Sequence, residues 1–97
     1  MTKREEIFDL IKKYKELHRE EYGIKKIGVF GSLTKKSKEN FNDVDIVVDL
    51  DSPNLFHLIA IKQELEEFLG FGVDIVRYRS KMNPYLKKHI DNEAVYV

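Results

Sequence analysis

Hydrophobic residues near the N-terminus recur at intervals of three and four. The apolar positions, with lysines and glutamates between them, are Ile7, Leu10, Ile11, Tyr14 and Leu17. This spacing places one apolar stripe along a helix, so the pattern predicts a helix over residues 3–21. Thr2 is the expected N-cap, with Glu5 three residues later, and Gly23 is expected to end the helix.

Three further segments are apolar enough to form the strands of a sheet, namely Ile24–Phe30, Asp43–Asp49 and Val73–Tyr78. The second of these segments has a clear period of two. Residues two apart on a strand point to the same face, so one face of this strand is expected to be aliphatic. The opposite face is expected to carry Asp43, Asp45, Val47 and Asp49.

The segments between the strands carry the signals of helix termini. Asp51-Ser52-Pro53 predicts a helix start, because a capping residue is followed by proline in the first turn. This helix is expected to end at Gly70 or Gly72. Its apolar residues are Leu55, Leu58, Ile59, Leu65, Phe68 and Leu69. Asn83-Pro84 predicts the start of a last helix, which runs to about residue 91.

A short helical turn is expected over residues 32–36, a loop over 37–42 and an extended tail over 94–97. Helices and strands therefore alternate along the chain. This order predicts the α/β or α+β class, with helices packed against a small sheet. Residues 1–97 contain no linker or repeat and are expected to form a single domain.

Polar residues interrupt the apolar pattern where the first strand ends and where the second begins. Gly31-Ser32 follows the first strand, and Asp43 and Asp45 open the second. A Gly-Ser turn that opens a helix offers backbone N–H groups and a hydroxyl to a phosphate. Two adjacent carboxylates repel each other unless a cation lies between them, and Mg²⁺ binds a few carboxylates together with substrate phosphates. The combination predicts phosphoryl or nucleotidyl transfer.

Two more residues are candidates for the same site. Asp74 lies in an otherwise apolar strand, where a carboxylate is costly to bury without a partner or a metal. Lys35, in the basic loop, is placed to meet a phosphate oxygen. The plainer interpretations are an aspartate on an edge strand that faces water and a lysine on a solvated face. The histidines are too scattered to predict a zinc site.

The composition excludes several classes of protein. Seventeen Lys and Arg residues balance 17 Asp and Glu residues, which argues against a broad nucleic-acid surface, since such a surface needs a basic excess. The chain has no cysteine and therefore no disulfide. No apolar run approaches the ~20 residues needed to cross a bilayer, and the N-terminal segment does not resemble a signal peptide. The expectation is a soluble cytoplasmic protein, with its oligomeric state open.

Gly31-Ser32 followed by Asp43-x-Asp45 resembles the nucleotidyltransferase superfamily, and most closely its minimal (MNT) branch. Val73–Val76 resembles the strand that carries the third aspartate of this family, and Leu86–Val97 resembles its closing helix and tail. One pair of positions differs, because members of the branch usually carry Arg-Gly where this chain has Lys35-Lys36. Lysine keeps the positive charge but lacks the bidentate geometry of arginine.

The resemblance implies the nucleotidyltransferase fold, in which helices flank a short twisted mixed sheet. It also implies a Mg²⁺-dependent transfer of AMP from ATP to a hydroxyl. It implies catalytic residues that also bind two Mg²⁺ ions, namely Asp43, Asp45 and Asp74. It implies nucleotide-binding residues, namely Gly31, Ser32 and Lys35. Members of the branch act as antitoxins that adenylylate a tyrosine of a HEPN-family toxin, so such a toxin is the expected partner. Two alternatives stay open: an antitoxin that blocks its partner by contact alone, and a small regulatory module without catalysis.

Overall fold

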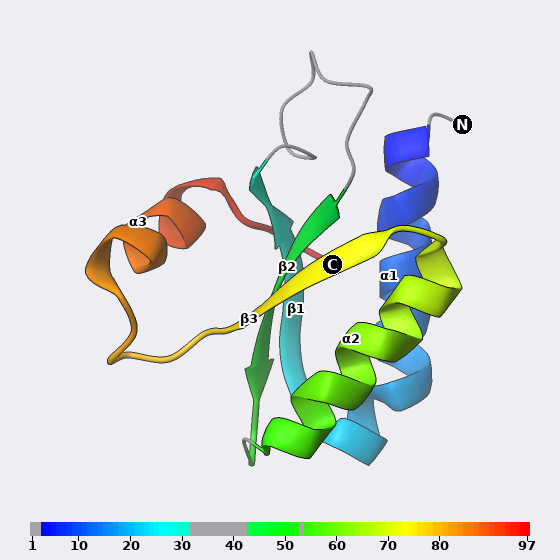
Figure 1. The fold of residues 1–97 in the computed structure, drawn as a ribbon, viewed down its shortest axis with the longest axis horizontal. Helices are drawn as coiled ribbons and strands as arrows, with labels where there is room; N and C mark the ends of the chain where they lie inside the picture. The colour runs from blue at the N-terminus through cyan, green and yellow to red at the C-terminus, as the bar shows by residue number, and fades with distance from the viewer. Residues whose placement is uncertain (1–2, 32–42, 53) are drawn as a thin grey trace.

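A four-stranded mixed sheet forms the centre of the protein, with helices packed on both of its faces (Figure 1). The computed structural model describes residues 3–31, 43–52 and 54–97. In chain order the elements are α1 (Lys3–Tyr22), β1 (Ile24–Phe30), β2 (Asp43–Leu50), α2 (Leu55–Leu69), β3 (Gly72–Arg77), α3 (Pro84–Glu93) and β4 (Val95–Tyr96). The expected α/β class and mixed sheet are confirmed. The expected Thr2 cap, the helical turn over 32–36 and the loop over 37–42 lie outside the described residues.

The strand order is β3-β2-β1-β4. β2 runs parallel to β3, as a strand–helix–strand connection through α2 requires, whereas β1 is antiparallel to both of its neighbours. The C-terminal tail, expected only to be extended, is a strand of the sheet. Its Tyr96 ring covers Gly28 so closely that a Cβ atom there would lie 2.8 Å from Tyr96 Cδ1. A glycine at position 28 therefore lets β4 close this edge.

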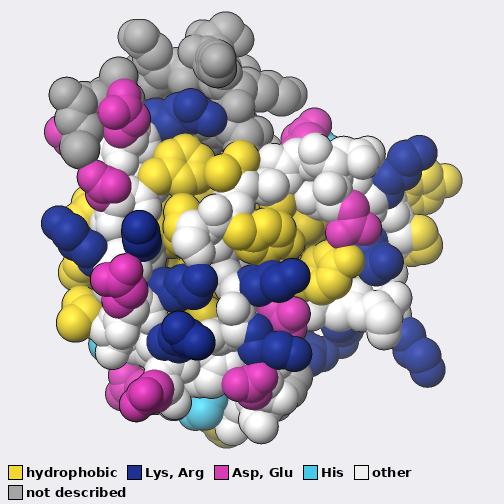
Figure 2. All heavy atoms as spheres, turned by 180° about the vertical axis from the view of Figure 1, so that it is seen from behind, with side chains coloured by type: hydrophobic (Ala, Val, Ile, Leu, Met, Phe, Trp, Pro, Cys, Tyr) yellow, Lys and Arg dark blue, Asp and Glu magenta, His cyan; other side chains and the backbone are white. Residues whose placement is uncertain are grey.

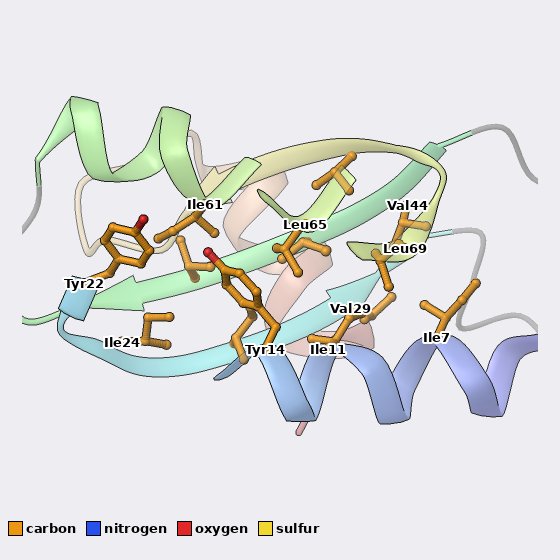
Figure 3. Close-up of a cluster of buried hydrophobic side chains, with 14 of the residues drawn as sticks. Ile7, Ile11, Tyr14, Tyr22, Ile24, Val29, Val44, Ile61, Leu65 and Leu69 are labelled. Atoms are coloured by element: carbon orange, nitrogen blue, oxygen red, sulfur yellow. The ribbon is translucent and has the colours of Figure 1, made fainter. Parts of the chain in front are cut away.

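α1 and α2 pack side by side on one face of the sheet, and their apolar side chains point into the main core (Figure 3). From α1 the buried residues are Ile7, Ile11, Tyr14 and Tyr22. The expected stripe is wrong at Leu17, whose side chain is 69% exposed. Tyr22 lies eight residues after Tyr14 and continues the buried side of the helix, whereas a residue three after Tyr14 lies off that side. None of the described helices is both long enough and apolar enough to cross a membrane.

α2 begins later than the sequence pattern predicts. Asn54 is the N-cap, and its side chain accepts a hydrogen bond from the Phe56 backbone N–H at 2.7 Å. The predicted cap, Asp51, instead donates its backbone N–H to Gly23 O at 2.8 Å, so it still belongs to the end of the sheet. The helix ends at Gly70, in a left-handed conformation, as expected.

Only part of the apolar surface of α2 meets the sheet. The buried residues are Ile61, Leu65 and Leu69. Leu55, Ile59 and Phe68, three of the apolar residues expected in this helix, are exposed. The helix is apolar over more than one side, and the pattern alone does not select the side that meets the sheet.

α3 is the one described helix on the other face of the sheet (Figure 1). Its N-cap is Asn83, as predicted, and the helix extends two residues beyond the expected end, to Glu93. A second core cluster holds it there, in which Ile90 packs with Phe30 of β1 and Val47 of β2. This face of the sheet carries the candidate site.

Candidate active site

Three aspartates lie on the face of the sheet that α3 partly covers. Asp43 and Asp45 precede Val47 on the same side of β2, and Val47 packs against α3. β2 and β3 pair in parallel register, which places Asp74 directly opposite Asp45. Asp43 and Asp74 are exposed, and Asp45 is half-buried between them. The structure therefore brings together the three carboxylates that the sequence analysis singled out.

Asp45 is the most constrained of these carboxylates. Partial burial raises the pKa of its carboxyl group above the usual range, and the negative charges of Asp74 and then Asp43 raise it further. His89 opposes this rise. A carboxylate held near two others without a cation carries an electrostatic cost, so the site favours binding of a positive charge.

Gly31 places the turn after β1 directly against Asp45. It has a φ of 76°, in the left-handed region. A Cβ atom at this position would collide with Asp45 Oδ2, because Phe30 is the register partner of Asp45. Glycine is therefore required both by the backbone conformation and by the neighbouring carboxylate. The other predicted nucleotide-binding residues, Ser32 and Lys35, lie outside the described residues.

The comparisons with known proteins agree with this arrangement. The family model described as polymerase beta, nucleotidyltransferase, matches residues 11–97. A relative from Thermococcus cleftensis, named protein adenylyltransferase MntA, is 37% identical, and the match covers 96% of this chain and 94% of the relative. The chain belongs to the nucleotidyltransferase family.

Solved structures with the same fold include one described as a candidate minimal nucleotidyltransferase. It is 26% identical with a TM-score of 0.75, and the match covers 98% of this chain and 95% of that one. A second structure, from Shewanella oneidensis, is described as a tri-AMPylated HEPN toxin in complex with an MNT antitoxin. It is 22% identical with a TM-score of 0.67, and the match covers 90% of this chain and 67% of that one.

The carboxylates of this nucleotidyltransferase have the right chemistry for Mg²⁺. Hard divalent ions prefer oxygen ligands, and these carboxylates supply them. Among residues 3–31, 43–52 and 54–97, no group of three acidic, His or Cys side chains is arranged to hold a metal ion. Mg²⁺ usually takes further ligands from water and substrate phosphates, so a metal held by these aspartates would need ligands from a bound nucleotide.

The structure places His89, which the sequence analysis had not assigned to the site, close enough to Asp45 to influence the pKa of its carboxyl group. His89 of α3 stands edge-on to the Phe30 ring, with ring centroids 6.2 Å apart, and Phe30 pairs with Asp45. Glu93, one turn later, has its Oε2 atom 3.0 Å from His89 Nε2. The i,i+4 spacing of a histidine and a glutamate on one helix was the available sequence signal.

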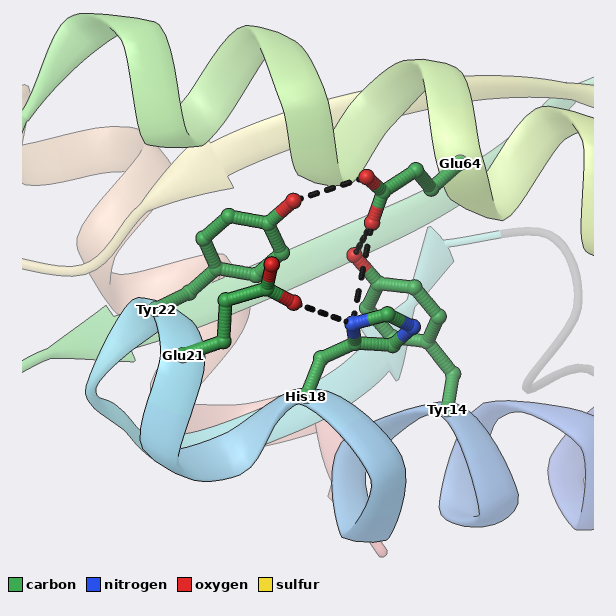
Figure 4. Close-up of polar contacts among 5 residues, drawn as sticks. All are labelled: Tyr14, His18, Glu21, Tyr22 and Glu64. Atoms are coloured by element: carbon green, nitrogen blue, oxygen red, sulfur yellow. Dashed lines mark hydrogen bonds and ion pairs between the residues drawn. The ribbon is translucent and has the colours of Figure 1, made fainter.

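A second polar cluster lies between α1 and α2, on the opposite face of the sheet from the aspartates (Figure 4). Glu64 of α2 accepts hydrogen bonds from the hydroxyls of Tyr14, at 2.8 Å, and Tyr22, at 2.7 Å. Burial first, and then the Glu64 contact, raise the pKa of Tyr22 to about 12 and raise that of Tyr14 as well. Two hydroxyl donors satisfying one carboxylate indicate a structural clamp between the helices.

Two surface hollows are lined by residues other than the three candidate aspartates, Asp43, Asp45 and Asp74. A cleft of about 200 Å³ is lined by Lys26, Asp49, Tyr78, Asp91 and Tyr96. Asp49 is four residues beyond Asp45, which is about 13 Å along a strand and too far to share its metal. A more open groove of about 1070 Å³ lies between α1 and the start of β1. Figure 2 views the molecule from behind relative to Figure 1 and shows Lys and Arg side chains gathered across the centre of that side. Neither hollow contains a candidate catalytic residue.

Proposed function

We propose that this nucleotidyltransferase transfers AMP from ATP to a tyrosine hydroxyl of a HEPN-family toxin and thereby acts as an antitoxin. The family membership supports nucleotidyl transfer. The name of the Thermococcus relative supports a protein acceptor, and the AMPylated toxin in the Shewanella complex supports a HEPN toxin as that acceptor. Both matches cover most of the present chain.

The observation that carries the proposal is the order of groups across the sheet. Gly31 at the end of β1, Asp45 on β2 and Asp74 on β3 follow one another along a single line of register. The turn at Gly31, with Ser32 and Lys35, would bind the triphosphate, and Asp43 and Asp45 would hold two Mg²⁺ ions with Asp74. The metal would neutralise phosphate charge and stabilise the leaving pyrophosphate. A site with this order has a donor side at β1 and an acceptor side at β3.

The positions of these groups on β1, β2 and β3 assign a role to each of them in the transfer. The acceptor oxygen forms a bond to the α-phosphorus of ATP, and the bond from that phosphorus to the bridging oxygen breaks to release pyrophosphate. Asp74, on the acceptor side, would orient the hydroxyl and receive its proton. Asp43 and Asp45 would keep the α-phosphate in line between the two oxygens.

The test is an incubation of the protein with a HEPN toxin, ATP and Mg²⁺, read by intact-mass spectrometry. We expect the toxin to gain the mass of one or more AMP units and tryptic mapping to place them on tyrosine. Asp45→Asn should abolish this gain while the complex still forms. Asp49→Asn, on the same strand face but distant from the site, is the matched control and should leave the transfer intact.

The opposite outcome would support the contact-only antitoxin. If the toxin gains no mass, and Asp45→Asn suppresses its activity as well as the wild type does, the proposed reaction is wrong. Suppression would then arise from the surface of the complex and not from chemistry at the aspartates.

A further inference from the structure

His89 is held over the donor side of the candidate site. Its neighbour Ile90 is 1% exposed and packs against Phe30 and Val47, which fixes the rotation of α3 over the sheet. The His89 ring stands edge-on to Phe30, at an interplanar angle of 82°. Phe30 precedes Gly31 in β1 and pairs with Asp45 in β2. The ring therefore lies at the end of β1 that leads into Gly31, on the strand next to that of Asp45, whereas Asp74 is on β3, on the far side of β2.

Glu93 restricts the orientation of this ring. Glu93 Oε2 is shielded from solvent and lies 3.0 Å from His89 Nε2, although it has no hydrogen-bond partner with good geometry among the described residues. A carboxylate beside Nε2 favours the tautomer that carries its proton there, and Nδ1 is then the acceptor left for a ligand. The side chain of His89 is 46% exposed, so a ligand can reach it.

The position of His89 separates two possible roles. A group over β3 would meet the acceptor, whereas a group over β1 and β2 would meet the nucleotide, whose phosphates are expected at the Gly31 turn. His89 contacts Phe30 of β1, and it opposes the rise in the pKa of Asp45 on β2. Its surroundings are therefore those of the nucleotide donor.

We propose that His89, oriented by Glu93, binds the nucleoside triphosphate through its Nδ1 atom, which accepts a hydrogen bond from a ribose hydroxyl of the nucleotide. This inference rests on the proposed function for the location of the nucleotide. It assigns the α3 side chains a role in binding the donor and none in recognising the protein acceptor.

Calorimetric titration with a non-hydrolysable ATP analogue and Mg²⁺, in the absence of any acceptor, tests the proposal directly. His89→Ala should weaken binding about tenfold, as expected for one lost hydrogen bond. Glu93→Gln should have a smaller effect, because the amide can still contact the ring. His18→Ala is the matched control, since His18 also pairs with a glutamate on its own helix but lies on α1, on the opposite face.

Rescue distinguishes a binding role from packing against Phe30. The side-chain amide of asparagine can place its oxygen, an acceptor like Nδ1, near the position of Nδ1, so His89→Asn should recover part of the affinity that His89→Ala loses. Equal losses in the two variants would assign His89 a packing role and overturn the proposal. Unchanged nucleotide affinity in His89→Ala would overturn it as well.

Steady-state kinetics with a HEPN toxin give a second readout. His89→Ala should raise KM for ATP and leave KM for the toxin unchanged, and the reverse pattern would contradict the donor-side assignment. A wild type that binds the analogue but transfers no AMP would contradict the proposed function alone, because the titration needs no transfer.

Discussion

At the scale of single residues, the site depends on the crowding around Asp45. Its carboxylate meets the Gly31 turn on one side and Asp74 on the other, with Asp43 two residues away on the same strand. Burial and like charge raise its pKa together. In the metal-free protein this residue therefore opposes folding, and Mg²⁺ with a nucleotide would reverse the effect. A residue that costs stability without its ligand is a common mark of a functional site.

Asp45→Asn should accordingly raise the free energy of unfolding of the metal-free protein at pH 7. Because the folded-state pKa of Asp45 is raised above the ordinary 3.8, the folded state binds this proton more tightly, and stability falls as the pH rises through that interval. Above the folded-state pKa the full cost is present, and asparagine removes it. Urea unfolding in EDTA at several pH values measures the effect. If Asp49→Asn raises the free energy of unfolding by a similar amount, the effect comes from the change in net charge and not from the surroundings of Asp45.

Gly31→Ala should cost both stability and activity. The left-handed conformation of a non-glycine residue costs about 1–2 kcal/mol, and the new Cβ would also displace the Asp45 carboxylate. Gly70→Ala is a matched control, because Gly70 has nearly the same φ, 77°, and no atom within 4 Å of the added Cβ. Both variants should lose stability in denaturant unfolding, but only Gly31→Ala should lose AMP transfer. If the two variants transfer AMP equally well, Gly31 is not part of the active site.

At the scale of elements, the sequence predicts the helices and strands well where the signal is local. The caps at Asn83 and Gly70 and the strand β1 agree with their sequence signals. The start of α2 does not, because Asp51 is kept in the sheet by its hydrogen bond to Gly23 O, a contact 28 positions away in sequence. Periodicity also could not choose among the apolar sides of α2. Long-range contacts decided the details that the local pattern left open.

The cap of α3 provides a test at this scale. Asn83 Oδ1 accepts hydrogen bonds from the backbone N–H groups of Tyr85, at 2.9 Å, and Leu86, at 3.2 Å. Asn83→Ala should lower the free energy of unfolding by about 1 kcal/mol, and Asn83→Ser should lower it less, because serine also caps helices. Urea unfolding of the three proteins measures both changes. Identical losses for alanine and serine would show that the cap does not stabilise α3.

At the scale of the whole molecule, the sheet separates stability from chemistry. The main core and the tyrosine–glutamate clamp lie on the α1–α2 face, and the aspartates lie on the α3 face. The sequence singled out Asp43, Asp45 and Asp74, and the sheet register brings these three carboxylates together. It could not single out His89, because the influence of His89 on Asp45 depends on how α3 packs. Nor could it identify the clamp, whose tyrosines lie 50 and 42 positions before Glu64.

This separation predicts the behaviour of Tyr22→Phe. The variant loses the hydroxyl that donates to Glu64 at 2.7 Å, so its free energy of unfolding at pH 7 should fall by about 1 kcal/mol. Because the folded-state pKa of Tyr22 is about 12, against an ordinary 10.0, the wild type should lose stability as the pH rises from 10 to 12. Tyr22→Phe should lose less stability over that interval. Part of the pH dependence should remain, because the pKa of Tyr14 is raised as well. Nucleotide affinity should not change, because the substitution lies across the sheet from Asp45. A variant that weakens nucleotide binding without unfolding would show instead that the two faces are coupled through the strands.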